Sequence, residues 1–466
     1  MRPRPVTAPV IPFLLRGLRA VLALLAVIAL TAQPAAAQRV LRDAETEALL
    51  NDMARPLIIA AGLDPRNVKM ILLQDEEINA FVAGGQAVYL HSGLIAKADN
   101  ANQVQGVIAH EIGHITGGHI IRFGEGMKAA TGITLLSLLL GAAAMAAGGG
   151  EAGMGILSAG QQAAMSKFLS FSRTQEASAD AAGVGFLKRA GISGRGMIDF
   201  FGKLRQQEYR LSSSYVDTDP YAQTHPMSAD RQATITADLQ ADPAWNKPSD
   251  PALEARFQRV KAKLIGYVEE PPTVLRLYPP SDTSLQAHYA RAFAYHKSAY
   301  PEQAAQEIDA LMAVNPHDPY FLELKGQVLL ESGDPRAALA PLREAVQRTR
   351  NEPLIASLLG HALVATDDPA LRTEAKQVLR TAVARDNDNP FAWYQLGVVY
   401  GQEGDVAHAA LATAERYSLE GRPALALASA ENALRGIPEG SADWIRAQDI
   451  SMTARTAVEE ERRRRR

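Results

Sequence analysis

The feature that most constrains the fold of this chain is a repeat in its C-terminal part. Small and apolar residues recur there at a fixed spacing of about 34 residues. The first two copies align at His288, Ala292, Tyr295, Ala299, Ala304, Ile308 and Leu311, and at Leu322, Gly326, Leu329, Gly333, Ala338, Leu342 and Ala345. The pattern continues at Ala356, Gly360 and Leu363 and, after a slip of three residues, at Trp393, Gly397, Tyr400 and Gly404. Such a period, with small residues where helices touch, predicts stacked pairs of helices.

This pattern resembles the tetratricopeptide repeat and predicts an α-solenoid over residues 285–460. An irregular helical bundle is the alternative, and the fixed period argues against it. Beyond Asp405 two helix pairings remain open, because a second set of small residues also fits: Gly421, Ala426, Ala430, Ala433 and Pro438. Solenoids of this kind usually bind a protein along a concave face, so the repeats predict a protein partner.

The first residues have the pattern of an export signal. Two arginines precede the apolar run 20–30, and small residues at Ala35 and Ala37 fit cleavage before Gln38. The run is short for a membrane-spanning helix, which needs about 20 apolar residues; a retained N-terminal anchor is the alternative. Residues 1–37 are therefore predicted to be a cleaved signal peptide.

Composition excludes several classes of protein. The formal net charge is -3, and removal of the predicted signal peptide takes away four arginines and no acid, so the mature charge is -7. This balance argues against a general nucleic-acid-binding protein. The absence of cysteine excludes disulfides, thiolate metal ligands and a cysteine nucleophile. The basic run 461–466 is expected to be a solvated tail, with attraction to acidic lipid or a partner as the alternative.

The segment HEIGH, residues 110–114, is the first candidate for a catalytic site. On a helix, His110 and His114 lie one turn apart on the same face, where both imidazoles can bind one metal ion. Glu111 is rotated by about 100° and can deprotonate a water molecule without being a ligand. The alternative is a helix that buries two histidines in a core. Position 120, where a longer form of this motif has a third histidine, is Ile120, so a third ligand must come from elsewhere.

The segment SRTQEASAD, residues 172–180, offers that third ligand. Glu176 and Asp180 are four residues apart and share one helix face, and the alanines around them permit close helix packing. One carboxylate can reach the metal, and the other can orient a ligand histidine. Two imidazoles and a carboxylate at a hydrolytic site favour one zinc ion per chain.

Two strands and two unusual segments complete the organisation. Strands are predicted at residues 68–73 and 86–90. Residues 129–166 are rich in Ala, Gly and Leu, and positions 129–150 contain no charged residue. We interpret this segment as an apolar flap that touches a membrane or covers the cleft; a transmembrane hairpin and plain core helices are the alternatives. Residues 236–284, rich in Pro and Asp around one helical piece, are interpreted as a linker.

The two motifs together resemble the HtpX-like zinc endopeptidases, whose second signature is Glu-x-x-Ala-Asp. With the export signal and the repeats, the chain is most similar to the beta-barrel assembly-enhancing protease (BepA) type of that family. The resemblance covers about residues 40–235 for the protease and 285–440 for the repeats. It implies a mainly α protein: a zincin-type metalloprotease domain at residues 38–235, helical with a small β-sheet, followed by the solenoid. It also implies a periplasmic location.

The resemblance assigns roles to individual residues. It implies that His110, His114 and Glu176 bind zinc and that Glu111 is the general base. The remaining assignments are Asp180 beside a ligand histidine and Arg173 in local structure or electrostatics.

His225, which precedes a proline in "THPMSADR", is expected near the zinc. It would either stabilise the oxyanion or occupy the open metal position. A substrate is expected to lie extended along the strand 86–90. The residues expected to contact it are Asn79, Phe81, Val88 and Leu90.

The expected function is degradation of misfolded or stalled envelope and outer-membrane proteins, with chaperone-like help to outer-membrane assembly. The expected partners are these substrates, the outer-membrane assembly machinery through the repeats, and a peripheral membrane contact, but no nucleic acid. A non-proteolytic scaffold or chaperone that docks through its repeats is the alternative. A zinc-dependent hydrolase of small molecules or cell-wall peptides is disfavoured, because the repeats indicate a protein partner.

Overall fold

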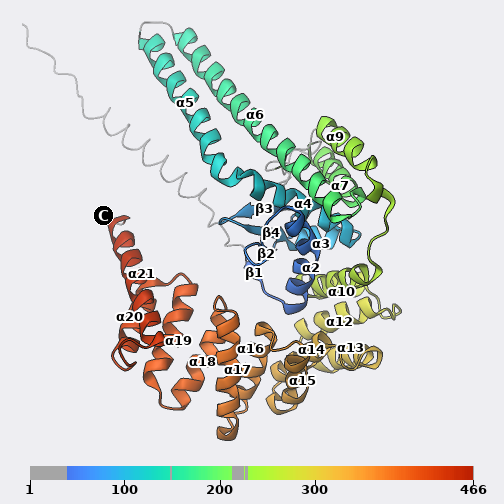
Figure 1. Cartoon of the computed structure of the whole chain (residues 1–466), viewed down its shortest axis with the longest axis vertical. Coiled ribbons are helices and arrows are strands. Elements are labelled where there is room, and N and C mark those ends of the chain that lie inside the picture. Colours follow the sequence, from blue (N-terminus) through green and yellow to red (C-terminus); the bar gives the residue numbers. More distant parts are fainter. Residues whose placement is uncertain (1–38, 147–149, 213–224, 226–228, 465–466) are drawn as a thin grey trace, which may run out of the picture. The chain divides into compact units, whose positions relative to one another are not determined.

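A computed structural model describes residues 39–146, 150–212, 225 and 229–464 (Figure 1). The predicted signal peptide, 1–37, lies outside the described residues. The predicted fold class is confirmed: a helical domain with one small sheet precedes a long series of antiparallel helix pairs.

The N-terminal domain contains a four-stranded sheet with the order β1-β2-β4-β3. Its strands are β1 (Arg39–Leu41), β2 (Lys69–Gln74), β3 (Ala80–Ala83) and β4 (Ala87–His91). β4 runs parallel to β2 and antiparallel to β3. The turn between β3 and β4 uses Gly84 and Gly85, whose φ angles of 58° and 97° are readily adopted by glycine.

The expectation that a substrate pairs with residues 86–90 is wrong. β4 is hydrogen-bonded to a strand on each side, and its Val88 and Leu90 side chains lie in the hydrophobic core. Strand order is set by contacts distant in sequence, which the local pattern of a strand does not contain. Among the described strands, β3 is outermost on this side of the sheet, so its outer edge is the open one.

Helices surround this sheet. They are α2 (Ala44–Ala60), α3 (Ser92–Lys97), α4 (Ala101–Gly117), α5 (His119–Ala146), α6 (Gly150–Ala190), α7 (Arg195–Ser212) and α9 (Ala229–Gln240). α4, which carries HEIGH, begins where the Asn100 side chain accepts a hydrogen bond from the Gln103 N–H. It ends at Gly118, in the left-handed conformation with φ 62°. Between these caps it is buried along most of its length, so the motif is held rigidly.

The predicted flap, 129–166, lies in an antiparallel hairpin formed by α5 and α6 (Figure 1). The alternative of plain core helices is wrong, because only 6% of the apolar window in His119–Ala144 is buried. By length and composition alone, this stretch could cross a membrane. α6 continues beyond the hairpin into the domain, where it carries Glu176 and Asp180.

Residues 236–284 are more than a linker. They contain η1 (Pro243–Asn246), α10 (Pro251–Val268) and α11 (Pro271–Leu277). α10 places Phe257 and Val260 in the core of the N-terminal domain. On its other side, a Cβ on Gly266 would lie 2.5 Å from the Ala290 carbonyl oxygen, so α10 packs directly against the first repeat helix. α10 therefore belongs to both cores.

The repeats consist of five helix pairs. Their helices are α12 (Leu285–Lys297), α13 (Pro301–Val314), α14 (Pro319–Glu331), α15 (Pro335–Arg348), α16 (Pro353–Ala365), α17 (Arg372–Arg385), α18 (Pro390–Gln402), α19 (Val406–Leu419), α20 (Pro423–Leu434) and α21 (Ala442–Arg464). The predicted slip of three residues corresponds to η2 (Pro369–Leu371), inserted before α17. After Asp405, α19 packs against both α18 and α20, and α20 also packs against α21, so the contacts fit both predicted pairings. The basic run extends α21 as far as Arg464.

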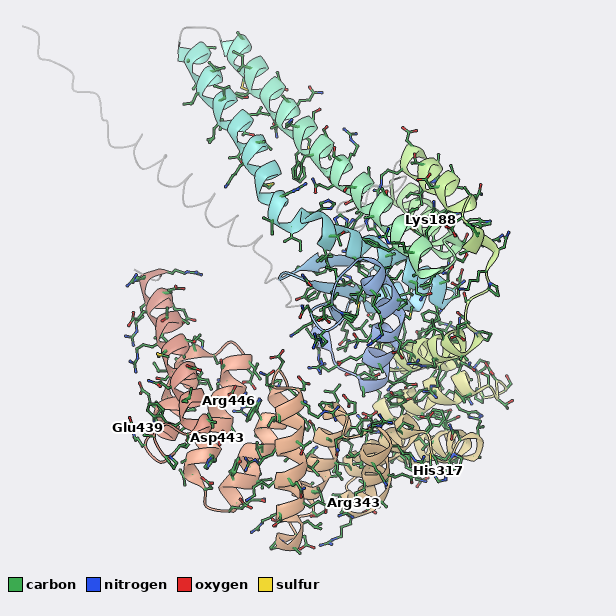
Figure 2. All side chains as sticks on the ribbon, in the orientation of Figure 1. Lys188, His317, Arg343, Glu439, Asp443 and Arg446 are labelled. Atoms are coloured by element: carbon green, nitrogen blue, oxygen red, sulfur yellow. The ribbon has the colours of Figure 1, made fainter. Side chains whose placement is uncertain are left out.

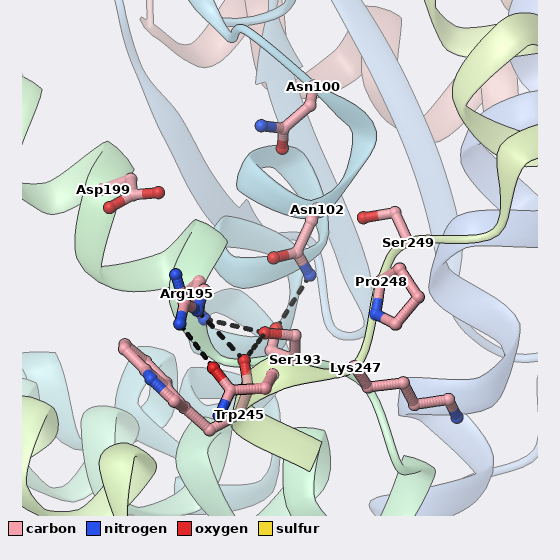
Figure 3. Close-up of a pocket in the computed structure, with 10 residues that line it drawn as sticks. Asn100, Asn102, Ser193, Arg195, Asp199, Trp245, Lys247, Pro248 and Ser249 are labelled. Atoms are coloured by element: carbon pink, nitrogen blue, oxygen red, sulfur yellow. Dashed lines mark hydrogen bonds between the residues drawn. The ribbon is translucent and has the colours of Figure 1, made fainter.

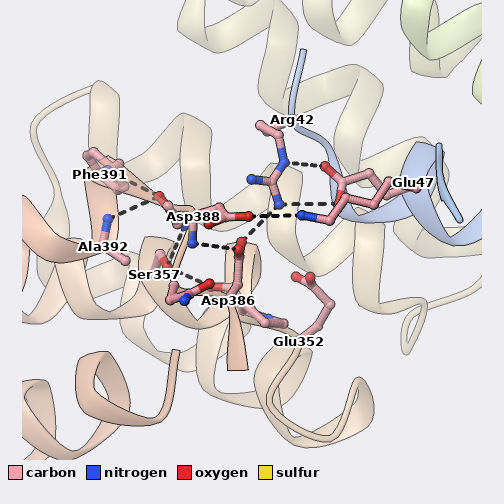
Figure 4. A network of polar contacts seen from close by, with 12 residues as sticks. Arg42, Glu47, Glu352, Ser357, Asp386, Asp388, Phe391 and Ala392 are labelled. Atoms are coloured by element: carbon pink, nitrogen blue, oxygen red, sulfur yellow. Dashed lines mark hydrogen bonds and ion pairs between the residues drawn. The ribbon is translucent and has the colours of Figure 1, made fainter. Parts of the chain in front are cut away.

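Side-chain contacts link successive repeats and join them to the N-terminal domain. His317 and Arg343, labelled in Figure 2, each lie 2.7 Å from a glutamate, Glu344 and Glu374 respectively. Figure 4 shows the junction with the N-terminal domain, where Arg42 lies 2.9 Å from an Asp386 oxygen. The His317 and Arg343 contacts are partly exposed, and each stabilises the fold by at most about 1 kcal/mol.

Candidate metal centre

Helices α4 and α6 bring the three predicted ligands together. His110, His114 and Glu176 are all buried. The Nε2 atoms of the two histidines are 3.1 Å apart. Each of these nitrogens lies 3.3 Å from a different carboxylate oxygen of Glu176. Glu176 lies 62 and 66 positions after His114 and His110, yet the three side chains point to one place.

The two helices can approach this closely because small residues meet at their contact. A Cβ on Gly113 would lie 2.5 Å from the carbonyl oxygen of Ala179. One turn further along α6, a Cβ on Gly183 would lie 3.1 Å from the backbone of Ala109. The helices therefore pack backbone against backbone, which places Glu176 within reach of both histidines.

His225 contributes a fourth donor to the same point. Its Nδ1 is 3.0 and 3.1 Å from the Glu176 oxygens and 3.4 Å from His110 Nε2. Donors at about 2.0–2.1 Å from a tetrahedral zinc ion are roughly 3.3–3.4 Å from one another. The separations among these donors, 3.0–3.4 Å, agree with that geometry. Converging nitrogen and oxygen lone pairs also repel one another unless a cation lies between them, so the residues fit a metal ion.

Asp180 and Arg231 support the ligands from behind. Asp180 Oδ1 lies 2.9 Å from His110 Nδ1, the ring nitrogen that faces away from the other donors. Arg231 donates to both Asp180 oxygens, at 2.6 and 2.9 Å, and its Nη2 lies 3.2 Å from Glu176. A carboxylate behind a ligand imidazole fixes its orientation and increases its basicity. Sequence reasoning missed Arg231, although it ends the quoted "THPMSADR" segment.

The charges of these groups shift their protonation equilibria. Burial by itself would lower the pKa of His110, but the carboxylates of Asp180 and Glu176 raise it to about 10. Burial would raise the pKa of Glu176, yet the charge of His225 and hydrogen bonds with the two α4 histidines hold that pKa well below its usual value. Glu176 is therefore ionised at neutral pH, the form in which a carboxylate binds a metal.

Glu111 lies beside the ligand cluster without joining it. It is fully buried, and neither carboxylate oxygen has a hydrogen-bond partner among the described residues. Its nearest described charged neighbour is His225, whose Nε2 is 3.9 Å from Oε1. A buried carboxylate without partners is costly, and such groups occur where a ligand or water completes the site. Glu111 also lines a cavity of about 300 Å³ with Phe81 and Val82 from the edge strand β3.

The other predicted residues divide into two groups. Phe81 lines the cavity and Asn79 is buried just before β3, whereas Val88 and Leu90 belong to the core. Arg173 is exposed, and no contact described for this part of the chain joins it to the ligands. Arg231 occupies the position near the carboxylates instead.

His119 is a second residue that sequence reasoning did not place at the site. Its Nδ1 lies 2.9 Å from Nδ1 of His114, so it contacts the ring nitrogen opposite the donor atom. Burial lowers the pKa of His119 to about 4, and the ring is neutral. It follows the left-handed Gly118, and this tight turn between α4 and α5 returns its ring to His114. The glycine was the available signal in the sequence.

A second cavity, of about 390 Å³, lies near the start of α4 (Figure 3). Asn102 there donates to the Ser193 carbonyl at 2.8 Å and accepts from the Gly196 N–H at 2.8 Å. Arg195 donates to the Trp245 carbonyl at 3.2 Å. These hydrogen bonds fix the start of α7 against α4. The residues that line this cavity therefore support α4, the helix that carries His110 and His114.

Comparisons with known proteins agree with this arrangement. Residues 41–238 match the profile of peptidase family M48. The chain is 27% identical over 405 residues to a beta-barrel assembly-enhancing protease of Yersinia pestis, covering 85% of this chain and 81% of that protein. It is 34% identical over 181 residues to the metalloprotease LoiP of Escherichia coli (strain K12), covering 38% of this chain and 64% of that protein. Among solved structures, YrrB, a TPR protein with an unusual peptide-binding site, is 19% identical with a TM-score of 0.31 and covers 38% of this chain and 91% of its own.

The predicted resemblance is thereby confirmed over both halves of the chain. Residues 41–238, which match peptidase family M48, form a metalloprotease domain that is joined in this chain to a helical repeat domain.

Proposed function

We propose that this chain is a zinc-dependent endopeptidase of the periplasm that degrades misfolded or stalled envelope and outer-membrane proteins. The observation that carries the proposal is the convergence of His110, His114 and Glu176 at tetrahedral separations, with Glu111 beside them and without a hydrogen-bond partner among the described residues. Imidazole and carboxylate donors in this geometry favour zinc. The similarity to the beta-barrel assembly-enhancing protease of Yersinia pestis supports the cellular role.

The residues of the chain divide the chemistry between them. A zinc ion bound by the three ligands would act as a Lewis acid, which lowers the pKa of a bound water molecule and polarises the peptide carbonyl. Glu111 accepts the proton of the attacking water at a carboxylate oxygen and returns it to the leaving amine. Asp180 and Arg231 hold His110 and Glu176 in place while the charges change.

Of the two roles expected for His225, we favour the blocking one in this conformation. Its Nδ1 stands at the fourth vertex of the donor set, where a water molecule would otherwise lie. A water molecule and the imidazole cannot occupy this position at the same time. His225 therefore has to leave before cleavage, after which its ring is free to stabilise the oxyanion.

We place the substrate on β3 instead of β4. An extended peptide that adds to the outer edge of β3 bonds through its backbone, which suits substrates of varied sequence. Phe81 and Val82 on this strand face the same cavity as Glu111, so such a peptide passes the reacting groups. The repeats would dock the chain on the outer-membrane assembly machinery, and this docking also supports the alternative function, a non-proteolytic scaffold.

The test combines zinc content with cleavage of casein by residues 38–466 and three variants. We expect one zinc per chain in wild type, Glu111→Gln and Glu439→Gln, the last being a control on the repeat surface (Figure 2). Glu111→Gln should abolish cleavage, while Glu439→Gln should match wild type. His225→Ala should cleave faster than wild type, because the fourth position is open.

Two outcomes would oppose the proposal. A zinc-free wild type under zinc-replete conditions would contradict a metal centre. Full biological activity of Glu111→Gln in cells, measured as outer-membrane protein assembly, would favour the scaffold.

A further inference from the structure

The α5–α6 hairpin has two different outer sides. On α5, Ser137 and Gly141 face α6: a Cβ on Gly160 would meet the Ser137 side chain, and one on Gly141 would meet Leu157. The opposite side of α5 carries Leu135 and Leu139, which are 57% and 71% exposed. Three further leucines flank them and are also at least half exposed: Leu136, Leu138 and Leu140.

Charged side chains are scarce along the described part of the hairpin. α5 has no charged residue after Lys128, which is itself exposed. The exposed side chains of α6 are mixed, because Gln161, Gln162 and Lys167 alternate with Met154, Met165 and Leu169. The glycine contacts set the register between the helices, and this register places Lys128 and Lys167 within about one turn of each other. Both lysines thus lie at the end of the apolar stretch nearer the metal centre.

Two polar side chains of the apolar stretch on α5 bond within the helix. Thr134 Oγ1 donates to the Ala130 carbonyl at 3.1 Å, and Ser137 Oγ donates to the Ile133 carbonyl at 2.7 Å. Thr131 is exposed, but from Leu135 to Ala144 the α5 surface that faces away from α6 is an apolar strip, about 15 Å long at 1.5 Å per residue. Protein-binding surfaces usually combine an apolar centre with hydrogen-bonding groups, and this strip lacks them among its described residues.

We propose that this hairpin docks on a lipid bilayer, with the outer side of α5 in the interface and α6 toward water. An apolar helix side that docks in the plane of the interface is buried roughly 5–10 Å deep. Lys128, about two helical turns before the strip, has a long stem that lets its ammonium reach lipid phosphates.

Docking would bring the metal centre to the lipid surface. α5 begins at His119, which contacts His114, and the next residue, Ile120, lines the cavity beside Glu111. A bound hairpin would thus hold the cavity close to the bilayer. This inference does not depend on proteolysis, so it can be tested with an inactive chain.

The test is flotation of residues 38–466, carrying Glu111→Gln to prevent self-cleavage, with vesicles of phosphatidylethanolamine and phosphatidylglycerol. We expect the chain to float with the vesicles. Leu135→Ser with Leu139→Ser should weaken vesicle partitioning at least tenfold, by roughly the transfer of two leucine side chains. The matched control is Leu277→Ser, at the end of α11, because Leu277 is 55% exposed outside the hairpin.

Several results would overturn the inference. Failure of the parent chain to float, or equal flotation of the double variant, would exclude docking through this strip. If the double variant instead loses concentration-dependent self-association, measured by sedimentation without lipid, the strip binds a second copy. If it loses binding to unfolded casein while floating normally, the strip binds protein substrates. Circular dichroism and thermal unfolding of each variant confirm that the fold is retained.

Discussion

Replacement of Gly113 by alanine tests whether the close approach of α4 and α6 builds the metal centre. The added Cβ would lie 2.5 Å from the Ala179 carbonyl oxygen and 2.9 Å from its Cα, whereas ordinary contacts begin at 3.4 Å. Backbone atoms cannot rotate away as a side-chain tip can. α6 therefore has to retreat by roughly 0.5–0.9 Å at this contact.

The size of the expected loss in zinc affinity follows from the position of Glu176. It lies three residues before Ala179 on the same face of α6, so its carboxylate moves away from His110 and His114 by a similar distance. Metal sites tolerate deviations of about 0.2 Å in ligand distance. We expect zinc affinity to fall roughly 10–100-fold, as when other supports of metal ligands are disturbed. Overpacking should destabilise the fold by about 1–3 kcal/mol, offset in part by about 1 kcal/mol from the better helix former.

The assay is zinc competition with a chromophoric chelator, together with urea unfolding of the apo and zinc-loaded chain. Gly124→Ala is the matched control, because Gly124 lies in helix α5 with no atom within 4 Å of an added Cβ. That control should keep its zinc affinity and lose no stability. Unchanged zinc affinity in Gly113→Ala would refute the reasoning, since the helix contact would then not determine the position of Glu176.

Three further predictions concern other buried charges. Asp180→Asn should weaken zinc binding about tenfold in the same competition assay, because a neutral amide supports His110 less well. Lys263→Met should cost about 3–5 kcal/mol in urea unfolding, since it leaves Asp43 and Glu45 without the buried lysine that both contact; Lys376→Met, in an exposed pair, should cost less than about 1 kcal/mol. Glu323 has a pKa raised to about 8, first by burial, and its Oε2 has no hydrogen-bond partner. Its stabilisation is complete below pH 4.5, the ordinary value for Glu, and is lost as pH rises toward 8. Glu323→Gln should therefore be more stable than wild type at pH 8 by roughly 1–3 kcal/mol and lose that advantage at pH 4.5, measured by denaturant unfolding at both pH values.

The repeat domain could be predicted well from sequence because its determinants are local and recur. Gly326 and Gly360 are one period apart, and each packs against a leucine of the second helix in its pair, Leu342 and Leu379. A larger residue at either glycine would collide with that leucine at 2.4 Å. The sequence pattern therefore records the packing directly, including the slip of three residues at η2.

The helical piece predicted within residues 236–284 is α10, but its burial and the helix α11 were not predicted. The prolines of this segment were taken to mark a junction, yet α10 and α11 begin at Pro251 and Pro271, and most repeat helices also begin at a proline. Proline suits the first turn of a helix, because the N–H it lacks would have no partner within the helix there. A proline after Asp or Glu can therefore mark a helix start as readily as a loop, and only the burial of α10 distinguishes the two.

The metal centre divides in the same way between local and distant determinants. The spacing within the pairs His110–His114 and Glu176–Asp180 predicted that each pair shares one helix face, and the family resemblance distinguished Glu176 from Asp180. Arg231 and the open edge of β3 depend instead on how α9 and the strands return to these helices. A salt bridge to a buried carboxylate leaves no periodic trace in sequence, since one arginine at any distance can supply it. The sequence could have suggested that positive charge is required here, because two buried carboxylates face two imidazoles. The metal together with Arg231 would supply that charge.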